Sequence, residues 1–340
     1  MTPGSDSTIF RKIRLKPTLA KRTDPTMKTE IVSKMSRLSR ALLVATLALA
    51  GTASVKAADF FYNTIGGTVN LGNASGAYDN TGATYKNWAI FTLGGNVTIT
   101  DPSPYTPGSV PSYDVIGNVG ISGSGRLSMS NSYIDGTVTE TSAGQLGSNV
   151  FAGNNSNPYY NGTIGLNSAY ISQGVADAIA ASNAAAALTA THTAPGNTAV
   201  ITTAKDESSA FGITGGGQPG QTYVINLTDL ILQGASAALV LHGDAATNYV
   251  INISRYMSLA GGAKITLAGG LTEANVLYNV KSNATQYDVT LSGGSEAHGI
   301  ILATTRAVKE TGNSVIYGEV IAKSVSLSGA SNVINPLTSP

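Results

Sequence analysis

Residues 289–329 repeat two short segments in alternation. The first reads Val289-Thr-Leu-Ser-Gly293 and returns as Val325-Ser-Leu-Ser-Gly329, and the second reads His298-Gly-Ile-Ile-Leu-Ala303 and returns as Tyr317-Gly-Glu-Val-Ile-Ala322. Brief strands of alternating aliphatic residues, punctuated by Gly at a spacing of 19 residues between Gly299 and Gly318, are typical of the coils of a β-solenoid. We therefore predict a mainly β fold, a right-handed parallel β-helix.

The Leu-x-Leu units of this region predict one surface feature. In each unit the aliphatic residues should point inward and the middle residue outward. If the units stack in register, their middle residues form one rank of short hydroxyls, our candidate outward binding face: Ser258, Thr266, Thr290 and Ser326. Glu319, Lys264 and Arg306 are charged, and we expect them to interrupt neighbouring faces.

One segment in the middle of the chain, residues 172–190, departs from this β pattern because it is rich in Ala, the best helix former. Residues 58–165, before it, still consist of short strands separated by Gly, Asn and Ser, as in Asn96-Val-Thr-Ile-Thr100. We expect Ser172 to cap the helix of residues 172–190, and Val175 and Ile179, four residues apart, to lie on one face of it. The prediction is one long Ala-rich helix, about 172–190, packed alongside a single β-solenoid domain that spans 58–340.

The first 57 residues differ in charge from the rest. They hold eleven of the 20 Lys and Arg residues but only three acids, so a leader of +8 precedes a body of −7. A short apolar run, 41–50, and small residues ending at Ala57 follow. These features describe a secretory signal peptide with a long basic n-region, cleaved near Ala57. Met1, Met27 and Met35 remain alternative starts, and the extracellular space is the expected location.

Composition excludes several classes of function. The chain has no Cys, so it has neither disulfides nor thiolate metal ligands. Few charges and many Gly, Ser, Thr, Asn and Ala argue against nucleic acid as a partner. The apolar run at 41–50 is too short to span a bilayer, and the segment 333–340 resembles neither an apolar anchor nor a sortase motif. We expect no transmembrane anchor in the mature chain.

No catalytic constellation is apparent in the sequence. A polysaccharide-cleaving β-helix needs clustered carboxylates, whereas the acids here are spread thinly and Asp206-Glu207 is expected to lie in a solvated turn. Asp135 and Glu319 lie far apart in sequence. The histidines, His192, His242 and His298, have no second His or carboxylate at metal-ligand spacing. We predict a protein without catalytic residues, cofactor or metal.

The segments 257–270, 275–280, 299–303 and 318–324 resemble the bacterial choice-of-anchor A family. With the Ala-rich helix before them, they are also similar to the ice-binding-like β-solenoid superfamily. The first resemblance implies an exported adhesive module. The second implies a helix packed beside a right-handed β-helix, and ice binding through a flat face of Thr, Ser and Ala.

These resemblances leave three functions open. The favoured one is a secreted, non-catalytic adhesive or structural module that binds an extracellular surface, a polysaccharide or a protein. Its possible contacts are tyrosines that are expected to be exposed: Tyr159, Tyr160, Tyr287 and Tyr317. The alternative is an ice-binding, antifreeze-like protein with ice as its partner. The third is a polysaccharide-active β-helix enzyme.

Overall fold

The computed structural model describes residues 88–101, 114–146, 168–281 and 287–335, together with short strands between them. The predicted signal peptide at 1–57 lies outside these residues, and so it stays a prediction. The chain divides into two units, 1–53 and 54–340, and the second is described here. Two strands near its start, β1 (Ala77–Tyr78) and β2 (Thr84–Tyr85), pair antiparallel.

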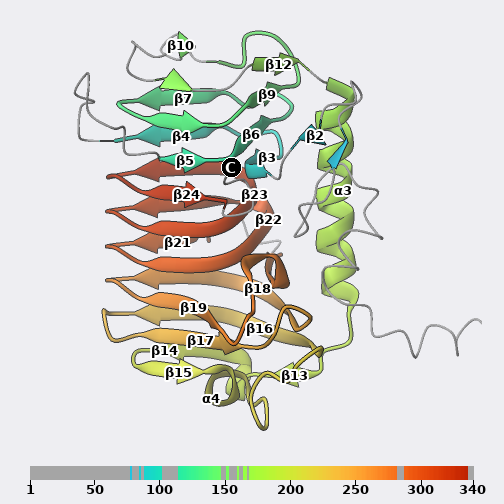
Figure 1. Cartoon of the computed structure of the whole chain (residues 1–340), viewed down its shortest axis with the longest axis vertical. Coiled ribbons are helices and arrows are strands. Elements are labelled where there is room, and N and C mark those ends of the chain that lie inside the picture. Colours follow the sequence, from blue (N-terminus) through green and yellow to red (C-terminus); the bar gives the residue numbers. More distant parts are fainter. Residues whose placement is uncertain are drawn as a thin grey trace, which may run out of the picture. The chain divides into compact units, whose positions relative to one another are not determined.

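All other strands pair in parallel and stack as the coils of a β-solenoid with three faces (Figure 1). This confirms the predicted fold class. The face that the long helix covers, called the helix face, contains β3 (Trp88–Thr92), β6 (Asn118–Ile121), β9 (Val138–Glu140), β12 (Ile164–Leu166), β13 (His192–Thr193), β20 (Val276–Val280) and parts of the four long strands β16 (Thr222–Gln233), β18 (Asn248–Ala260), β22 (Glu296–Thr311) and β23 (Val315–Ser328).

Two further faces complete each coil. The hydroxyl face contains β4 (Val97–Thr100), β7 (Leu127–Ser130), β14 (Thr198–Ile201), β21 (Val289–Ser292) and the last residues of β16, β18, β22 and β23. The charged face contains β5 (Val115–Ile116), β8 (Tyr133–Asp135), β10 (Phe151–Ala152), β11 (Tyr159–Tyr160), β15 (Ala204–Asp206), β17 (Ala238–His242), β19 (Lys264–Ala268), β24 (Asn332–Ile334) and the first residues of β22 and β23.

The repeated segments stack on one another, as the sequence predicts. Gly299 pairs with Gly318, and Val308 pairs with both Val289 and Val325. Gly318 lies at the corner between the charged and helix faces with a φ of 137°, where a Cβ atom would lie 2.1 Å from the Gly299 carbonyl oxygen. The corner therefore requires glycine because a side chain would separate the stacked coils.

The order of the coils in space differs from their order in the chain. The strands of the N-terminal half stack on the last coil: Ile90 pairs with Val320, Thr98 with Ser326, and Val115 with Val333. A long helix, α3 (Ser168–Ala187), then runs along the flank toward the other end of the solenoid (Figure 1). The chain continues there with β13, and the coils that follow stack one after another until β23 meets the N-terminal strands. Each face is consequently continuous across segments that are far apart in sequence.

The structure separates Val175 and Ile179, which the sequence places on one face of the helix. Val175 packs against the helix face beside the buried residues Ile171, Ala178, Ala181 and Ala185, whereas Ile179 is 45% exposed. Helix α3 begins at Ser168, so Ser172 lies inside it rather than at its cap. Ile171 extends the packed stripe by one turn at the N-terminal end. Small alanines allow close approach to the sheet, and they determine the packed face more than the larger Ile179 does.

Short elements cover the end of the solenoid at which β13, β14 and β15 lie. Helix α4 (Glu207–Phe211) follows β15, and its Phe211 is fully buried beneath the coils. Two single 3₁₀ turns, Pro195–Asn197 and Glu273–Asn275, connect strands. None of the helices in the described part of the chain is long and apolar enough to cross a membrane.

Candidate functional site

Three of the four candidate residues share one face. Thr290 pairs with Ser258, and the same column of outward positions reaches Ser326 through Lys309. Thr266 does not belong to this rank. It pairs with Val240 on the charged face, because β19 follows the Gly261-Gly262 turn and so lies one corner further along the coil than β18. Lys309 lies between Thr290 and Ser326 and interrupts the rank of hydroxyls.

The N-terminal coils extend the same column. Ser326 pairs with Thr98, and Thr98 pairs with Ser128. A second outward column runs parallel to the first, two residues further along each strand. From β18 to β7 the first column reads Ser258, Thr290, Lys309, Ser326, Thr98 and Ser128, and the second reads Ala260, Ser292, Thr311, Ser328, Thr100 and Ser130. Every position except Lys309 and Ala260 carries a hydroxyl.

The inward residues of these strands anchor the lattice to the core. Val97, Ile99, Leu127 and Met129 are buried, as are the equivalent residues of β21 and β23. Neighbouring strands lie about 4.8 Å apart, and alternate residues about 6.7 Å apart along a strand. Hydroxyls fixed at these intervals form a two-dimensional lattice over six consecutive strands.

The hydroxyls differ in what they bind. Thr290 Oγ1 donates to Ser258 Oγ at 3.0 Å and lies 3.3 Å from Tyr256 Oη, and Ser258 is only 7% exposed. In contrast, the hydroxyls of Thr98 and Ser128 make no side-chain hydrogen bond to any described residue, and Ser128 is exposed. The N-terminal strands therefore present hydroxyls that are free to bind water.

The lattice ends toward β14. The next positions of the first column are Ile231 and Val200, and Val200 is 51% exposed. Beside them, Arg255 Nε donates to Asp229 Oδ1 at 2.7 Å. Apolar and charged side chains thus replace the hydroxyls in the two coils at that end.

The charged face carries an ion-pair network around His298. His298 Nδ1 lies 2.8 Å from Glu273 Oε1, its Nε2 lies 2.9 Å from Glu296 Oε1, and its ring stacks on Tyr317 at 4.6 Å. Lys264 Nζ pairs with Glu296 at 2.8 Å. Burial alone would lower the pKa of His298, but the hydrogen bonds with the two carboxylates raise it. His298 is therefore a member of a network and not the isolated turn residue that its sequence context indicates.

Asp206 and Glu207 have structural roles, and only Asp206 matches the predicted solvated turn. Asp206 Oδ1 accepts from the Ser209 N–H at 2.8 Å, which caps α4, and hydrogen bonds from Ser209 and Ser208 lower its pKa to about 2. Glu207 is buried and accepts from the Gly217 N–H at 2.6 Å, with His242 Nδ1 at 2.9 Å. These contacts hold the loop after α4 in place.

Two charged residues expected on the surface are buried. Arg306 is 2% exposed and Glu319 is 1% exposed. Arg306 lies in an irregular part of β22, where its register with β23 shifts between Ala303 and Ala307, so its side chain turns inward. Glu319 pairs with Ile300 on the helix face, and Asp135 pairs with Ile116 on the charged face, so these two acids are not brought together.

The tyrosines expected to be exposed and the remaining histidine lie in different parts of the structure. Tyr287 lies 5.9 Å from Tyr256 beside the hydroxyl face, whereas the side chains of Tyr159 and Tyr160 lie outside the described ones. His192 contacts Thr191 and Tyr223. Within the described residues, no group of three or more His, Asp or Glu side chains is arranged to hold a metal ion.

Comparison with known proteins identifies relatives. The chain is 36% identical over 101 residues to an ice-binding protein of Flammulina populicola and 32% identical over 85 residues to one of Leucosporidium. These matches cover 30% and 25% of this chain, but only 38% and 30% of the two relatives.

Among solved structures, an ice-binding protein from an Arctic yeast is similar at 22% identity and a TM-score of 0.44, over 74% of this chain and 91% of the other. One from the Antarctic ascomycete Antarctomyces psychrotrophicus is similar at 17% identity and a TM-score of 0.39, over 73% and 93%. The ice-binding-like family profile matches residues 106–335, more than half of the chain. The chain therefore belongs to the ice-binding-like family.

Proposed function

We propose that the protein binds ice through the hydroxyl face. The observation that carries this proposal is the lattice of Ser and Thr hydroxyls in two columns from β18 to β7. A rigid, flat and repeating set of hydroxyls can order water in an ice-like arrangement, because the backbone ladder fixes the intervals between them. Family membership supports the proposal, and two relatives are themselves named ice-binding proteins.

The other two faces are less suitable for ice. Helix α3 covers the helix face, where residues such as Phe91 and Leu277 are buried. The charged face carries Lys264, Glu296 and His298, whose charges differ from coil to coil. Charged side chains hold their own hydration shells, so this face offers no uniform pattern to a crystal.

This proposal reverses the order favoured by the sequence alone, which placed an adhesive module first and ice binding second. Export by the leader at 1–57 remains part of the proposal, since ice forms outside the cell. A non-catalytic role agrees with the structural use of Asp206, Glu207 and His298 described above.

Thermal hysteresis tests the proposal. We expect purified protein to separate the melting and freezing temperatures of a seeded crystal and to change the shape of that crystal. An albumin solution of equal concentration provides the control for colligative effects. Hysteresis no greater than that of albumin, with crystals that keep their shape, would contradict ice binding and leave the adhesive module as the better function.

A further inference from the structure

A pocket opens where α3 ends and the coils continue. Its volume is about 470 Å³, and it lies between Ala186 at the last turn of the helix, β16, β18 and the segment that follows α3. Because the helix stops before the solenoid does, the helix face is left uncovered in these coils (Figure 1). The volume is in the range of small-molecule sites.

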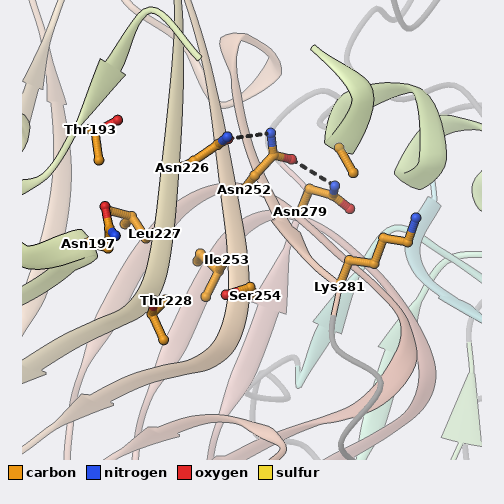
Figure 2. Close-up of a pocket in the computed structure, with 11 residues that line it drawn as sticks. Thr193, Asn197, Asn226, Leu227, Thr228, Asn252, Ile253, Ser254, Asn279 and Lys281 are labelled. Carbon is orange, nitrogen blue, oxygen red and sulfur yellow. Dashed lines mark hydrogen bonds between the residues drawn. The ribbon is translucent and has the colours of Figure 1, made fainter. Parts of the chain in front are cut away.

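A ladder of three asparagines leads into this pocket from beneath the helix (Figure 2). Asn279 is fully buried and donates from Nδ2 to Asn252 Oδ1 at 2.8 Å, and Asn252 donates to Asn226 Oδ1 at 3.1 Å. Asn279 and Asn252 also donate to the carbonyls of Ser182 and Ala185, which satisfies groups near the end of α3.

The direction of the hydrogen bonds in this ladder determines which atom of Asn226 is free to bind a ligand. The Ser182 hydroxyl donates to Asn279 Oδ1 at 2.7 Å, so every amide oxygen in the ladder accepts. Asn226 is exposed, and its Nδ2 donates to no described residue. Chains of hydrogen bonds polarise one another, so the Asn226 amide is a donor prepared for an acceptor on a ligand.

The other lining groups define the class of ligand. Four more side chains present polar atoms that make no side-chain hydrogen bond to described residues: Thr193, Asn197, Thr228 and Ser254. Among the described residues, none that lines the pocket carries a carboxylate, and Lys281 Nζ already donates to Asn183 Oδ1 at 2.7 Å. Neutral donors and hydroxyls around a shallow space suit a ligand that is itself rich in hydroxyl and ether oxygens.

We propose that this pocket binds a neutral saccharide, with the Asn226 amide as its principal donor. The sugar can come from two sources. It can be free or part of an extracellular polysaccharide. It can also be attached to the chain, because Asn226-Leu227-Thr228 is an N-glycosylation sequence. In that case, transfer from a lipid-linked oligosaccharide forms the bond between Asn226 Nδ2 and the first sugar carbon, breaks the sugar–phosphate bond, and releases the lipid diphosphate and one amide proton. Asn252-Ile253-Ser254 is a second such sequence on the pocket, but both hydrogens of the Asn252 amide are already donated.

Binding to unmodified protein tests the first source. Protein made in the bacterial cytosol, labelled with ¹⁵N, would be titrated with maltose, cellobiose and N,N′-diacetylchitobiose while NMR follows the backbone amide signals of the pocket residues and, where it is present, the Asn226 side-chain amide signal. We expect a saturable shift with at least one sugar, at a Kd in the millimolar range, and a loss of at least about tenfold in affinity for Asn226→Ala. The matched control is Gln233→Ala, which removes an exposed amide from the same strand on the hydroxyl face.

Mass spectrometry tests the second source. Protein secreted from yeast would be treated with peptide-N-glycosidase in ¹⁸O water, and a mass label at Asn226 but not at Asn252 would identify an attached glycan. The proposal is overturned if no sugar gives a saturable shift and Asn226 is unmodified, or if Asn226→Ala and Gln233→Ala bind alike. Neither result bears on ice binding, because the pocket and the hydroxyl face are on different sides of the coil.

Discussion

The hydroxyl face and the charged face are built by the same coils and the same backbone ladder. Outward positions on the first are mostly Ser and Thr, such as Thr98 and Ser128, whereas on the second they include Lys264, Glu296 and His298. Apart from Glu310, the inward residues of both are mostly aliphatic and buried. The difference teaches that the fold supplies spacing and flatness to every face, and that the outward side chains alone decide which face can act.

The scaffold that both faces share depends on the glycine corners. Gly318→Ala should destabilise the protein by about 3 kcal/mol or more, because the new Cβ would collide with the Gly299 carbonyl at a positive φ. Gly294→Ala is the matched control, since its φ is also positive but open space surrounds it, and it should cost about 1 kcal/mol. Denaturant unfolding measures both, and equal losses would mean that the coils can separate to accommodate a side chain.

The coil containing Lys309 is also irregular beneath the hydroxyl face. Glu310 is buried between Leu291 and Leu327 without a hydrogen-bond partner among the described residues, and burial raises its pKa well above the usual range. Glu310→Leu would place a third leucine between Leu291 and Leu327 and should stabilise the fold by about 2 kcal/mol at neutral pH.

The pH dependence of this gain follows from the direction of the shift. A carboxyl whose folded pKa is raised destabilises the folded state as pH rises above the unfolded value of 4.5. The gain from Glu310→Leu should therefore be larger at pH 8 than at pH 4, as measured by thermal unfolding with Glu296→Leu on the charged face as control. A loss of stability at pH 8 would mean that Glu310 compensates the charge of the buried Arg306.

Lys309 is the one charge within the hydroxyl lattice, and removing it should make the two faces more different. Lys309→Thr should increase thermal hysteresis by up to about twofold, and should cost at most about 1 kcal/mol of stability from the lost pair with Asp288, at 2.7 Å. Lys323→Thr removes an exposed charge from the corner of the next coil and serves as control. Equal hysteresis in the two variants would mean that a hydroxyl at position 309 does not improve ice binding.

On the charged face, His298 should make stability depend on pH near neutrality. Because the folded pKa of His298 is raised, its stabilising contribution is complete below the unfolded value of 6.5 and is lost as pH rises through the folded pKa. His298→Gln should reduce stability by up to about 1 kcal/mol at pH 5.5 and by less at pH 8.5. Thermal unfolding measures both values, and His192→Gln is the matched control because His192 has no carboxylate partner among the described residues. An equal loss at both pH values for His298→Gln would contradict the role of the two carboxylates.

Much of the fold could be predicted from the sequence, because the coil repeat is local. The 19-residue spacing of Gly299 and Gly318 corresponds directly to their pairing, and the Ala-rich segment forms the helix. The bounds of the helix and its packed face were less predictable. They depend on which residues the sheet contacts, so Ile171 is buried and Ile179 is exposed.

The candidate face could be predicted only in part. Ser258, Thr290 and Ser326 share it because their segments follow one another along the coil, but Thr266 has the same local pattern and lies beyond a corner. Thr98 and Ser128 were missed, although Val97-Thr-Ile-Thr100 and Leu127-Ser-Met-Ser130 carry the same alternation. Their place beside Ser326 follows from stacking of the first coils on the last one, a long-range contact that no local pattern encodes.

The most direct measurement is thermal hysteresis of two matched variants, Thr98→Tyr on the hydroxyl face and Thr266→Tyr on the charged face. Both replace an outward, half-buried Thr in a strand by a bulky side chain, and both should leave unfolding nearly unchanged. We predict that Thr98→Tyr reduces hysteresis at least about tenfold, because a protruding ring within the hydroxyl lattice prevents contact around it. Thr266→Tyr should keep the full hysteresis. Loss with Thr266→Tyr and retention with Thr98→Tyr would contradict the assignment of the hydroxyl face.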